Sequence, residues 1–378
     1  MLKRLRSIFF FQESGLLLVV VLLGVLFTLK SEPATYVVME TGADGTPQPV
    51  MTTNPDGEKV PLRKERNKFL NAQSLAQLAK DTSFIGIMAV GMVVVIISGG
   101  IDLSVGAAYA LAAVLAAKVM HYYGPLGDGH LMSPLSGTLL GMAVCIGTGV
   151  LCGLVNGGLV VLLRVHPFII TLGTMAIFRG IAFVVTGGQS VTDFPTTDGK
   201  MAVLQGVIKH ETGNELYLVP PAVMLLVMVV GWLFLRRLAA GRRVFAVGGN
   251  EIAARFSGIR VENVKLGVYL ISGLCAGISA LMSLGYYGSG SSGDGNGYEL
   301  DVVAAAVVGG ASLMGGRGSA LGAVLGALVI QMITHGIILL NIDQNYSRII
   351  IGIAVIAAVV MDNVNTALAR RRLARHAG

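Results

Sequence analysis

Residues 82–120 read TSFIGIMAVGMVVVIISGGIDLSVGAAYALAAVLAAKVM, and this stretch decides the fold class. Two apolar runs follow one another here, 82–98 and 104–120, with only a few residues between them. The hydrocarbon core of a bilayer is about 30 Å thick, and roughly 20 apolar helical residues cross it. The stretch therefore predicts two membrane helices joined by a short break within the bilayer, where protein or a water-filled path must surround the irregular backbone.

The rest of the chain repeats this pattern. Of its 378 residues, 54% are hydrophobic, 13% are charged and 51 are glycine, whereas a soluble protein carries about 25% charged residues. We predict an all-α, polytopic membrane protein with about ten transmembrane helices, some of them broken, packed closely through small residues. The ten candidate spans are residues 10–29, 82–98, 104–120, 137–163, 167–187, 217–235, 266–287, 301–314, 319–340 and 348–364.

The distribution of Lys and Arg predicts the orientation. Ten spans place both termini on one side, and the positive-inside rule assigns that side to the cytoplasm. The chain then divides into a cytoplasmic tail with the first helix (1–29), an insert on the outer side of the membrane (30–81), a transmembrane core (82–364) and a basic cytoplasmic tail (365–378). Within the insert we expect residues 36–39 and 59–62 to pair as a hairpin, and Asn71 to cap a short interfacial helix over residues 72–80.

One connection between spans is unusually long and basic. Residues 236–265 lie between two apolar spans and carry seven Lys and Arg residues in an amphipathic, helical pattern. A membrane helix normally turns and returns within a few residues, so this length needs a purpose. We interpret the stretch as a cytoplasmic docking element for a partner that drives the membrane subunit.

The sequence offers little support for chemistry by this chain alone. It holds no GxxxxGK[ST] motif for ATP phosphates. Gly288, Gly290 and Gly293 match G-x-G-x-x-G, but they follow a membrane span and open no βαβ unit. The His and Cys residues form no metal-binding spacing. We therefore expect no enzyme activity, no bound cofactor and no metal, and we exclude nucleic acid because the net charge of +7 gathers at the ends of spans.

A few polar residues stand inside the spans. Asp102 is the main acid there, and we expect it to cap the following span, to contact solute or to couple to protons. Arg179 is a cation within the span 167–187, and it shares a helical face with Thr171. These residues predict a sparse, mostly neutral lining that suits an uncharged polyhydroxy solute. The candidate translocation path comprises Asp102, Ser104, Asn156, Thr171, Thr174 and Arg179.

Two stripes of glycine repeat every fourth residue. One runs through Gly149, Gly153 and Gly157, and the other through residues 318, 322 and 326. Such stripes let another helix approach closely. The sequence leaves open whether that helix belongs to this chain or to a second copy.

Several motifs in order resemble the ribose-type permeases of bacterial ATP-binding-cassette (ABC) sugar importers. The resemblance covers residues 69–364, and it rests on residues 98–106 (SGGIDLSVG), 166–174 (HPFIITLGT), 241–259 (GRRVFAVGGNEIAARFSGI), 297–301 (GYELD) and 308–316 (VGGASLMGG). It implies a homodimer in the inner membrane, a cytoplasmic ATPase that binds ATP and Mg²⁺, and a periplasmic sugar-binding protein. The 31–68 insert is longer than this family usually carries, and we expect it to contact that binding protein.

The resemblance also implies roles for single residues. The coupling helix that contacts the ATPase would include Gly248, Gly249, Asn250, Glu251, Ala254 and Arg255. Glu299 and Asp301 would face the outer gate.

Two other functions remain open at this level. A branched-chain amino acid permease shares the general fold, but it needs a site for a zwitterion. A secondary transporter driven by an ion gradient would explain Asp102, but it leaves residues 236–265 without a purpose. A purely structural membrane scaffold has no specific feature in its favour.

Overall fold

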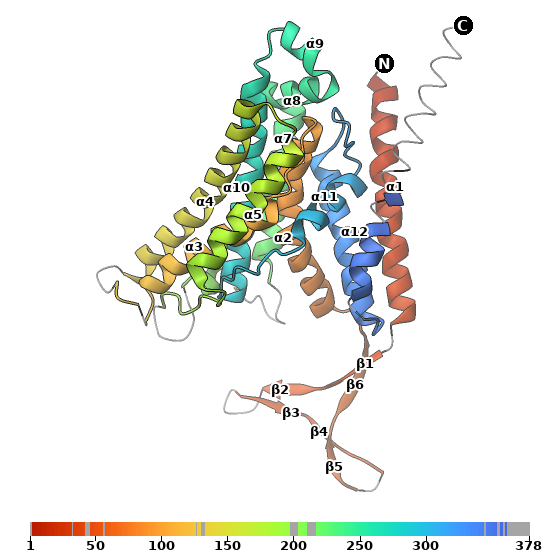
Figure 1. The fold of residues 1–378 in the computed structure, drawn as a ribbon. Coiled ribbons are helices and arrows are strands. Elements are labelled where there is room, and N and C mark those ends of the chain that lie inside the picture. Colours follow the sequence, from red (N-terminus) through yellow and green to blue (C-terminus); the bar gives the residue numbers. More distant parts are fainter. Residues whose placement is uncertain are drawn as a thin grey trace.

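The computed structural model describes residues 2–31, 33–41, 46–55, 57–125, 127–129, 133–196, 203–209, 217–343, 345–353, 356–357 and 360. The described chain is a bundle of helices with a narrow arm of β-strands at one end (Figure 1). The elements in chain order are α1 (Leu2–Lys30), β1 (Pro33–Val37), β2 (Met39–Thr41), β3 (Pro47–Pro49), β4 (Met51–Thr53), β5 (Lys59–Pro61), β6 (Arg63–Asn67), α2 (Ala72–Ile97), α3 (Val105–Tyr122), α4 (Pro134–Leu163), α5 (Pro167–Thr186), α6 (Val203–Ile208), α7 (Val219–Arg237), α8 (Ala239–Gly249), α9 (Glu251–Phe256), α10 (Val261–Tyr287), α11 (Tyr298–Val308) and α12 (Ala320–Leu339).

The helices confirm the predicted all-α membrane architecture. Seven described helices are long and apolar enough to cross a bilayer, namely α2, α3, α4, α5, α7, α10 and α12. The predicted span at 301–314 is an 11-residue helix, α11, which ends before a turn at Gly309 and Gly310. Of the predicted span 348–364, residues 348–353 are helical and most of the rest lies outside the described residues, as does the 365–378 tail.

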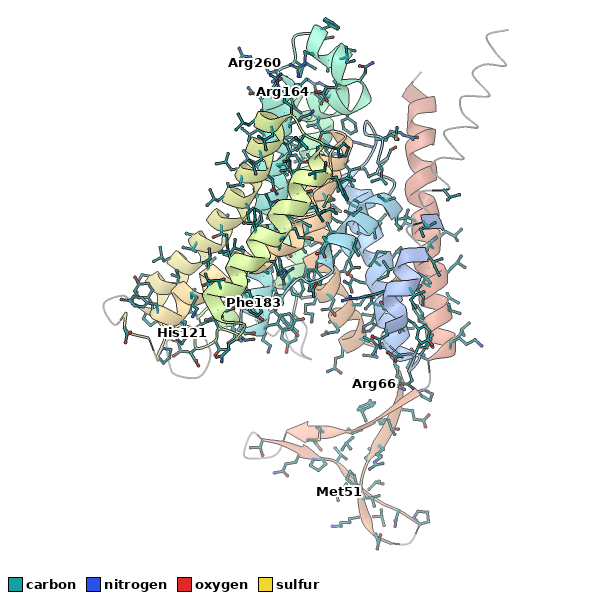
Figure 2. All side chains as sticks on the ribbon, viewed as in Figure 1. Met51, Arg66, His121, Arg164, Phe183 and Arg260 are labelled. Atoms are coloured by element: carbon teal, nitrogen blue, oxygen red, sulfur yellow. The ribbon has the colours of Figure 1, made fainter. Side chains whose placement is uncertain are left out.

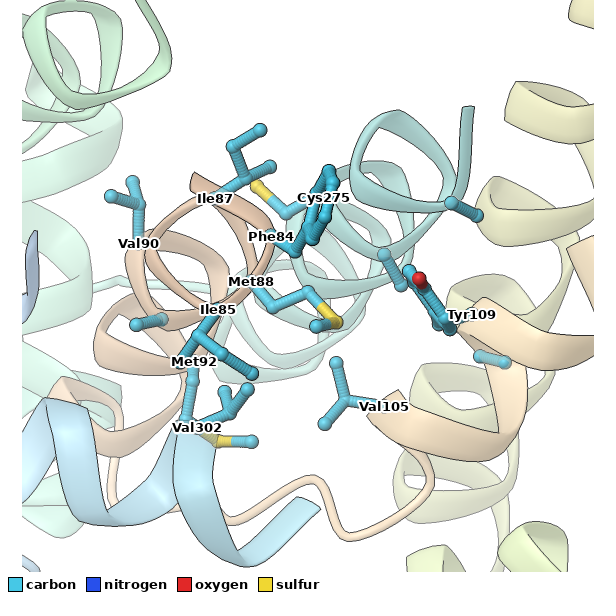
Figure 3. Packing of buried hydrophobic residues seen from close by; sticks show 14 of the residues in the cluster. Phe84, Ile85, Ile87, Met88, Val90, Met92, Val105, Tyr109, Cys275 and Val302 are labelled. Atoms are coloured by element: carbon cyan, nitrogen blue, oxygen red, sulfur yellow. The ribbon is translucent and has the colours of Figure 1, made fainter. Parts of the chain in front are cut away.

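The centre of the bundle is α2. Of its most apolar 18-residue window, 94% is buried, and α10, α12, α7 and α11 pack around it. Figure 3 shows Met88 and Met92 of α2 beside Cys275 of α10, Tyr109 of α3 and Val302 of α11. A helix that is apolar on all sides is expected at such a position.

The predicted short interfacial helix over residues 72–80 is the beginning of α2, not a separate helix. Asn71 caps it as expected, because its side-chain oxygen accepts the Ser74 N–H at 2.9 Å. The helix then continues through the charged residues at 80 and 81. Lys80 is buried, forms an ion pair with Asp81 at 2.8 Å, and lies 4.4 Å from the ring centroid of Tyr286. These contacts satisfy its charge inside the bundle, so the charged pair does not interrupt the helix.

Both glycine stripes pack within this chain. On α4, a Cβ at Gly153 would overlap the carbonyl oxygen of Tyr269 in α10, and one at Gly157 would lie 3.1 Å from the Cα of Leu266. On α12, a Cβ at Gly326 would overlap the carbonyl oxygen of Ala305 in α11. The described contacts therefore place helices of this subunit, rather than a second copy, against the stripes.

The arm occupies residues 33–67 and projects from the end of the bundle where α1 ends and α2 begins (Figure 1). Its strands pair antiparallel as β1 with β6, β2 with β3 and β4 with β5. The predicted pairing of 36–39 with 59–62 is wrong in its partners, although the Val38 N–H does donate to the Leu62 carbonyl at 2.9 Å. Residues 51–53 pair with β5 instead, across a tight turn in which the Gly57 N–H donates to the Asn54 carbonyl, because a short loop costs little entropy to close.

Candidate functional site

A buried polar network surrounds Asp102, which is 2% exposed. Its Oδ1 accepts the Ser104 N–H at 3.1 Å, the Ser104 hydroxyl at 2.8 Å and the Asn156 amide at 3.3 Å. Its Oδ2 accepts the Ser272 hydroxyl at 2.8 Å. Four hydrogen bonds from the segment before α3, from α4 and from α10 compensate the cost of burying this carboxylate.

The network extends to α5. The Asn156 amide also donates to the Ser104 hydroxyl at 2.6 Å, and the Thr174 hydroxyl donates to the Asn156 carbonyl oxygen at 2.6 Å. The Thr171 hydroxyl donates to the Ile101 carbonyl at 3.4 Å. Five of the six residues predicted to line the path thus come together. Sequence reasoning missed Ser272, and no sequence signal distinguishes it from the other buried serines of α10, Ser279 and Ser283.

The capping role expected of Asp102 takes a different form. The N-cap residue of α3 is Ser104, and its side chain makes no cap hydrogen bond to the helix. Asp102 instead accepts the N–H of that N-cap residue and reaches across to α4 and α10. Gly99, in the left-handed region at φ 83°, turns the chain immediately after α2 and allows this crossing.

The network makes a testable contribution to stability. Asp102→Leu leaves the Ser104 N–H and hydroxyl and the Ser272 hydroxyl buried without their acceptor, and it should cost about 3 kcal/mol or more of folding free energy. Asp102→Asn, which keeps one carbonyl acceptor, should cost less. The unfolding midpoint of the purified protein in detergent measures both changes. A midpoint for Asp102→Leu equal to that of the unchanged protein would show that the network is not structural.

Arg179 lies apart from this network. It projects from α5 and donates to the backbone carbonyls of Ser292 at 2.8 Å, Gly295 at 3.2 Å and Asp294. The sequence placed Arg179 in the path and gave it no partner. In the structure it fixes the segment 288–297 that precedes α11.

Glu299 and Asp301 stand in the first turn of α11, where the helix dipole favours acidic residues. The Glu299 carboxylate packs against the first turn of α3, since a Cβ on Gly106 would lie 2.6 Å from its Oε2. That oxygen is buried and has no hydrogen-bond partner in the described part of the chain.

Within the 236–265 stretch, residues 236–237 end α7, α8 and α9 follow, and residues 261–265 begin α10, so the connection is shorter than predicted. The helices α8 and α9 form one end of the bundle (Figure 1). Asn250 caps α9, because its side-chain oxygen accepts the Ala253 N–H at 2.9 Å. Ala254 is buried against Val247 and Val261. Two residues that the resemblance assigned to ATPase coupling therefore also build the turn between the two helices.

The end of α8 touches the core through backbone atoms. A Cβ on Gly248 would overlap the carbonyl oxygen of Ile97, the last residue of α2, and would lie 2.8 Å from the amide nitrogen of Gly316. The Gly316 N–H in turn donates to that Ile97 carbonyl at 2.9 Å. Gly249 packs here as well, with its Cα 3.2 Å from a Cβ built on Gly316. A movement of α8 would therefore also displace the end of α2 and the segment 309–319.

The exposed side of α9 combines charge with two apolar side chains. Glu251 pairs with Lys265 at 2.8 Å and Arg255 pairs with Glu262 at 2.7 Å; exposed pairs of this kind contribute little stability. Ile252 and Phe256, four residues apart on one helix face, are 70% and 89% exposed. Sequence reasoning missed these two, although an i, i+4 apolar pair in a short polar helix is a signal for a partner contact.

A cavity of about 520 Å³ lies between the docking element and the Asp102 network. Ser98 and Gly100 line it from the segment after α2, His166 from the start of α5, Glu251 from α9 and Tyr269 from α10. The Tyr269 hydroxyl also donates to the Ile101 carbonyl at 3.2 Å. Among the described residues, no group of three or more His, Cys, Asp or Glu is placed to hold a metal ion.

Comparison with known proteins agrees with this architecture. The family model described as "Branched-chain amino acid transport system / permease component" matches residues 74–359. The ribose import permease protein RbsC of Escherichia coli strain K12 is 34% identical over 78% of this chain and 87% of its own. The D-allose transport system permease protein AlsC of the same strain is 36% identical (78% and 85%), and the fructose import permease protein FrcC of Rhizobium meliloti is 31% identical (78% and 79%). No solved structure matches this chain.

These matches confirm the resemblance carried by the sequence motifs. The family model spans the region from the start of α2 past α12, so it includes the Asp102 network and the docking element. Together with the apolar helices they identify a multi-pass protein of the inner membrane. The chain therefore belongs to the ribose-type permease family of ABC importers.

Proposed function

We propose that this chain is the transmembrane permease subunit of an ABC importer that moves a monosaccharide, a pentose or a hexose, from the periplasm to the cytoplasm. Relatives named for ribose, D-allose and fructose support this substrate class. The mostly neutral, hydrogen-bonding residues near the core, such as Asn156 and Thr174, also suit a polyhydroxy solute better than an ion. The observation that carries the proposal is the backbone contact of Gly248 with Ile97 and Gly316, which joins the docking element to the core.

This contact gives a route from a partner to the transport path. A cytoplasmic ATPase, which binds ATP and Mg²⁺, docks on α8 and α9. When the ATPase closes on ATP, α8 shifts. This shift displaces the end of α2 at Ile97 and then the segment 98–104, which carries Asp102. The permease changes between two packings of the same helices, open to opposite sides. ATP supplies the energy, so Asp102 does not need to relay protons.

The remaining parts of the importer follow from this orientation. Two copies of the chain enclose the path, and both termini lie in the cytoplasm. The strand arm and the α1–α2 junction then lie on the periplasmic side, where a sugar-binding protein delivers the solute. Glu299 and Asp301, in the turn that opens α11, take part in the gate toward that side.

The description of the matching family favours one alternative, a branched-chain amino acid permease. Uptake assays in membrane vesicles loaded with ATP distinguish the candidates. In the presence of the binding protein, the vesicles should take up labelled ribose, allose or fructose but not labelled leucine. Uptake that persists after a protonophore has dissipated the proton gradient excludes a proton-driven transporter, and uptake of leucine alone would overturn the sugar proposal.

A charge exchange tests the docking assignment. Glu251→Lys places a cation beside Lys265 and reverses the charge that α9 presents, and it should reduce uptake at least tenfold. The double variant Glu251→Lys with Lys265→Glu restores the ion pair within the chain but keeps the reversed charge on α9. If the ATPase recognises Glu251, uptake by the double variant stays low while its unfolding midpoint matches the unchanged protein.

Recovery of uptake in the double variant would give a different result. It would mean that Glu251 acts only through its pair with Lys265, and the docking role of this residue would be wrong. Co-purification of the ATPase, measured by mass spectrometry for each variant, separates a loss of docking from a later step in transport.

A further inference from the structure

A large cavity lies outside the transport path. It is a groove of about 860 Å³ bordered by α7, α8 and α10. Its floor is apolar and is formed by Phe234 of α7 with Val268 and Ile271 of α10. Its rim carries three arginines from α8 and from the segment before α10: Arg242, Arg243 and Arg260. Its lining contains no acidic residue in the described part of the chain.

The groove exists because α7 and α10 both pack on α2. Gly231 of α7 lies against Val90, and Gly91 of α2 lies against Cys275 of α10. The furrow between the two outer helices remains open at Gly267, where an added Cβ would meet no heavy atom within 4 Å. An elongated apolar group can therefore enter between α7 and α10 without displacing a side chain.

The arginines stand near the expected edge of the membrane. The apolar helix α7 ends at Arg237, and the Arg236 guanidinium lies 5.8 Å from the ring centroid of Trp232, the single tryptophan of the chain. Tryptophan and arginine are typical of the interface between headgroups and hydrocarbon. Earlier in α7, toward the bilayer centre, Leu226 and Val230 are exposed on the helix face that carries Phe234, and they extend the apolar surface beyond the groove. The groove thus offers cations at headgroup depth and an apolar surface at acyl-chain depth. Figure 2 shows Arg260 at this end of the bundle.

We propose that this groove is a binding site for an anionic phospholipid. Three guanidinium groups without an acidic neighbour in the lining favour a phosphate diester, to which arginine can donate paired hydrogen bonds. Basic pockets between membrane helices commonly bind such headgroups. One acyl chain lies along Phe234 and Gly267. The combination of arginines with this apolar floor points to a lipid rather than to a free anion.

The test uses the full-length purified protein, stripped of native lipid and then exposed to phosphatidylglycerol, phosphatidylcholine or inorganic phosphate. One variant, Arg242→Gln with Arg243→Gln and Arg260→Gln, removes the headgroup contacts. A second, Gly267→Leu, blocks the furrow and leaves the charges intact. The control is Lys59→Gln with Arg63→Gln and Lys64→Gln, which removes three exposed charges from the strand arm.

Native mass spectrometry counts the bound lipid, and the unfolding midpoint reports stabilisation by it. Phosphatidylglycerol should remain bound to the unchanged and control proteins and raise their midpoints by several degrees. Retention should fall at least tenfold in both groove variants. Phosphatidylcholine and inorganic phosphate should have much smaller effects.

Other results would overturn the proposal. Equal lipid retention in all variants would show that the groove does not hold the lipid. A loss of retention in the arginine variant alone would show that no acyl chain lies in the furrow at Gly267. Stabilisation by inorganic phosphate but not by phosphatidylglycerol would show that the site binds a free anion. Unchanged lipid retention with loss of the co-purified ATPase in the arginine variant, or with a changed oligomeric state in Gly267→Leu, would assign the groove to the ATPase or to a second copy.

Discussion

Replacing Gly153 with valine is expected to prevent the folded subunit from accumulating in the membrane. Gly153 lies at the contact of α4 and α10, where an added Cβ would overlap the carbonyl oxygen of Tyr269 and lie 3.1 Å from the Cα of Leu270. Both obstacles are helix backbone, so no side chain can rotate to make room. Separating the helices should cost about 3 kcal/mol or more, at the upper end of overpacking effects. The separation would also displace Tyr269, whose hydroxyl holds the Ile101 carbonyl next to Asp102.

The same helix provides the control. Gly147 is exposed on α4, and an added Cβ there would meet nothing within 4 Å. Gly147→Val should therefore leave the protein near its normal amount and unfolding midpoint, as measured by gel filtration in detergent and a thermal scan. If Gly153→Val behaves like Gly147→Val, the close approach of α4 and α10 is not required for folding.

Replacing Ile252 and Phe256 together with serine should abolish association with the partner ATPase and leave the fold intact. Both side chains are exposed on α9, so their removal costs the isolated subunit little. Apolar anchors that fill pockets of a partner typically contribute about 2 kcal/mol or more each. Losing both should weaken binding roughly a thousandfold. Because ATP drives uptake, transport should fall to background.

Co-purification of the ATPase and sugar uptake are the measurements, and an unchanged unfolding midpoint shows that the variant is folded. Leu70→Ser is the control, because Leu70 is also exposed but lies at the start of α2, next to the strand arm. A double variant that still retains the ATPase would place the docking surface elsewhere on α8 and α9. A lowered midpoint would instead reveal a structural role for these side chains.

Fold class and family could both be predicted from the sequence alone. A membrane helix needs an apolar run of about 20 residues, however the helices pack. Such runs can therefore be recognised in the sequence alone. The motifs around Asp102 and the 241–259 segment were sufficient to identify the ribose-type permeases, and the matches confirm this. The long basic connection also predicted a helical element outside the bilayer, and α8 with α9 occupy it.

Which residues contact one another across the bundle could be learned only from the tertiary structure. Periodicity places Gly153 on a face, but it does not say that α10 covers that face. It likewise places Asp102 before a helix, but not within reach of Ser272, 170 residues later. Arg179 shares a helical face with Thr171 in the sequence pattern, yet its hydrogen bonds go to the backbone before α11. Contacts of this kind depend on which helices lie side by side, and that choice is made by the packing of the whole chain around α2.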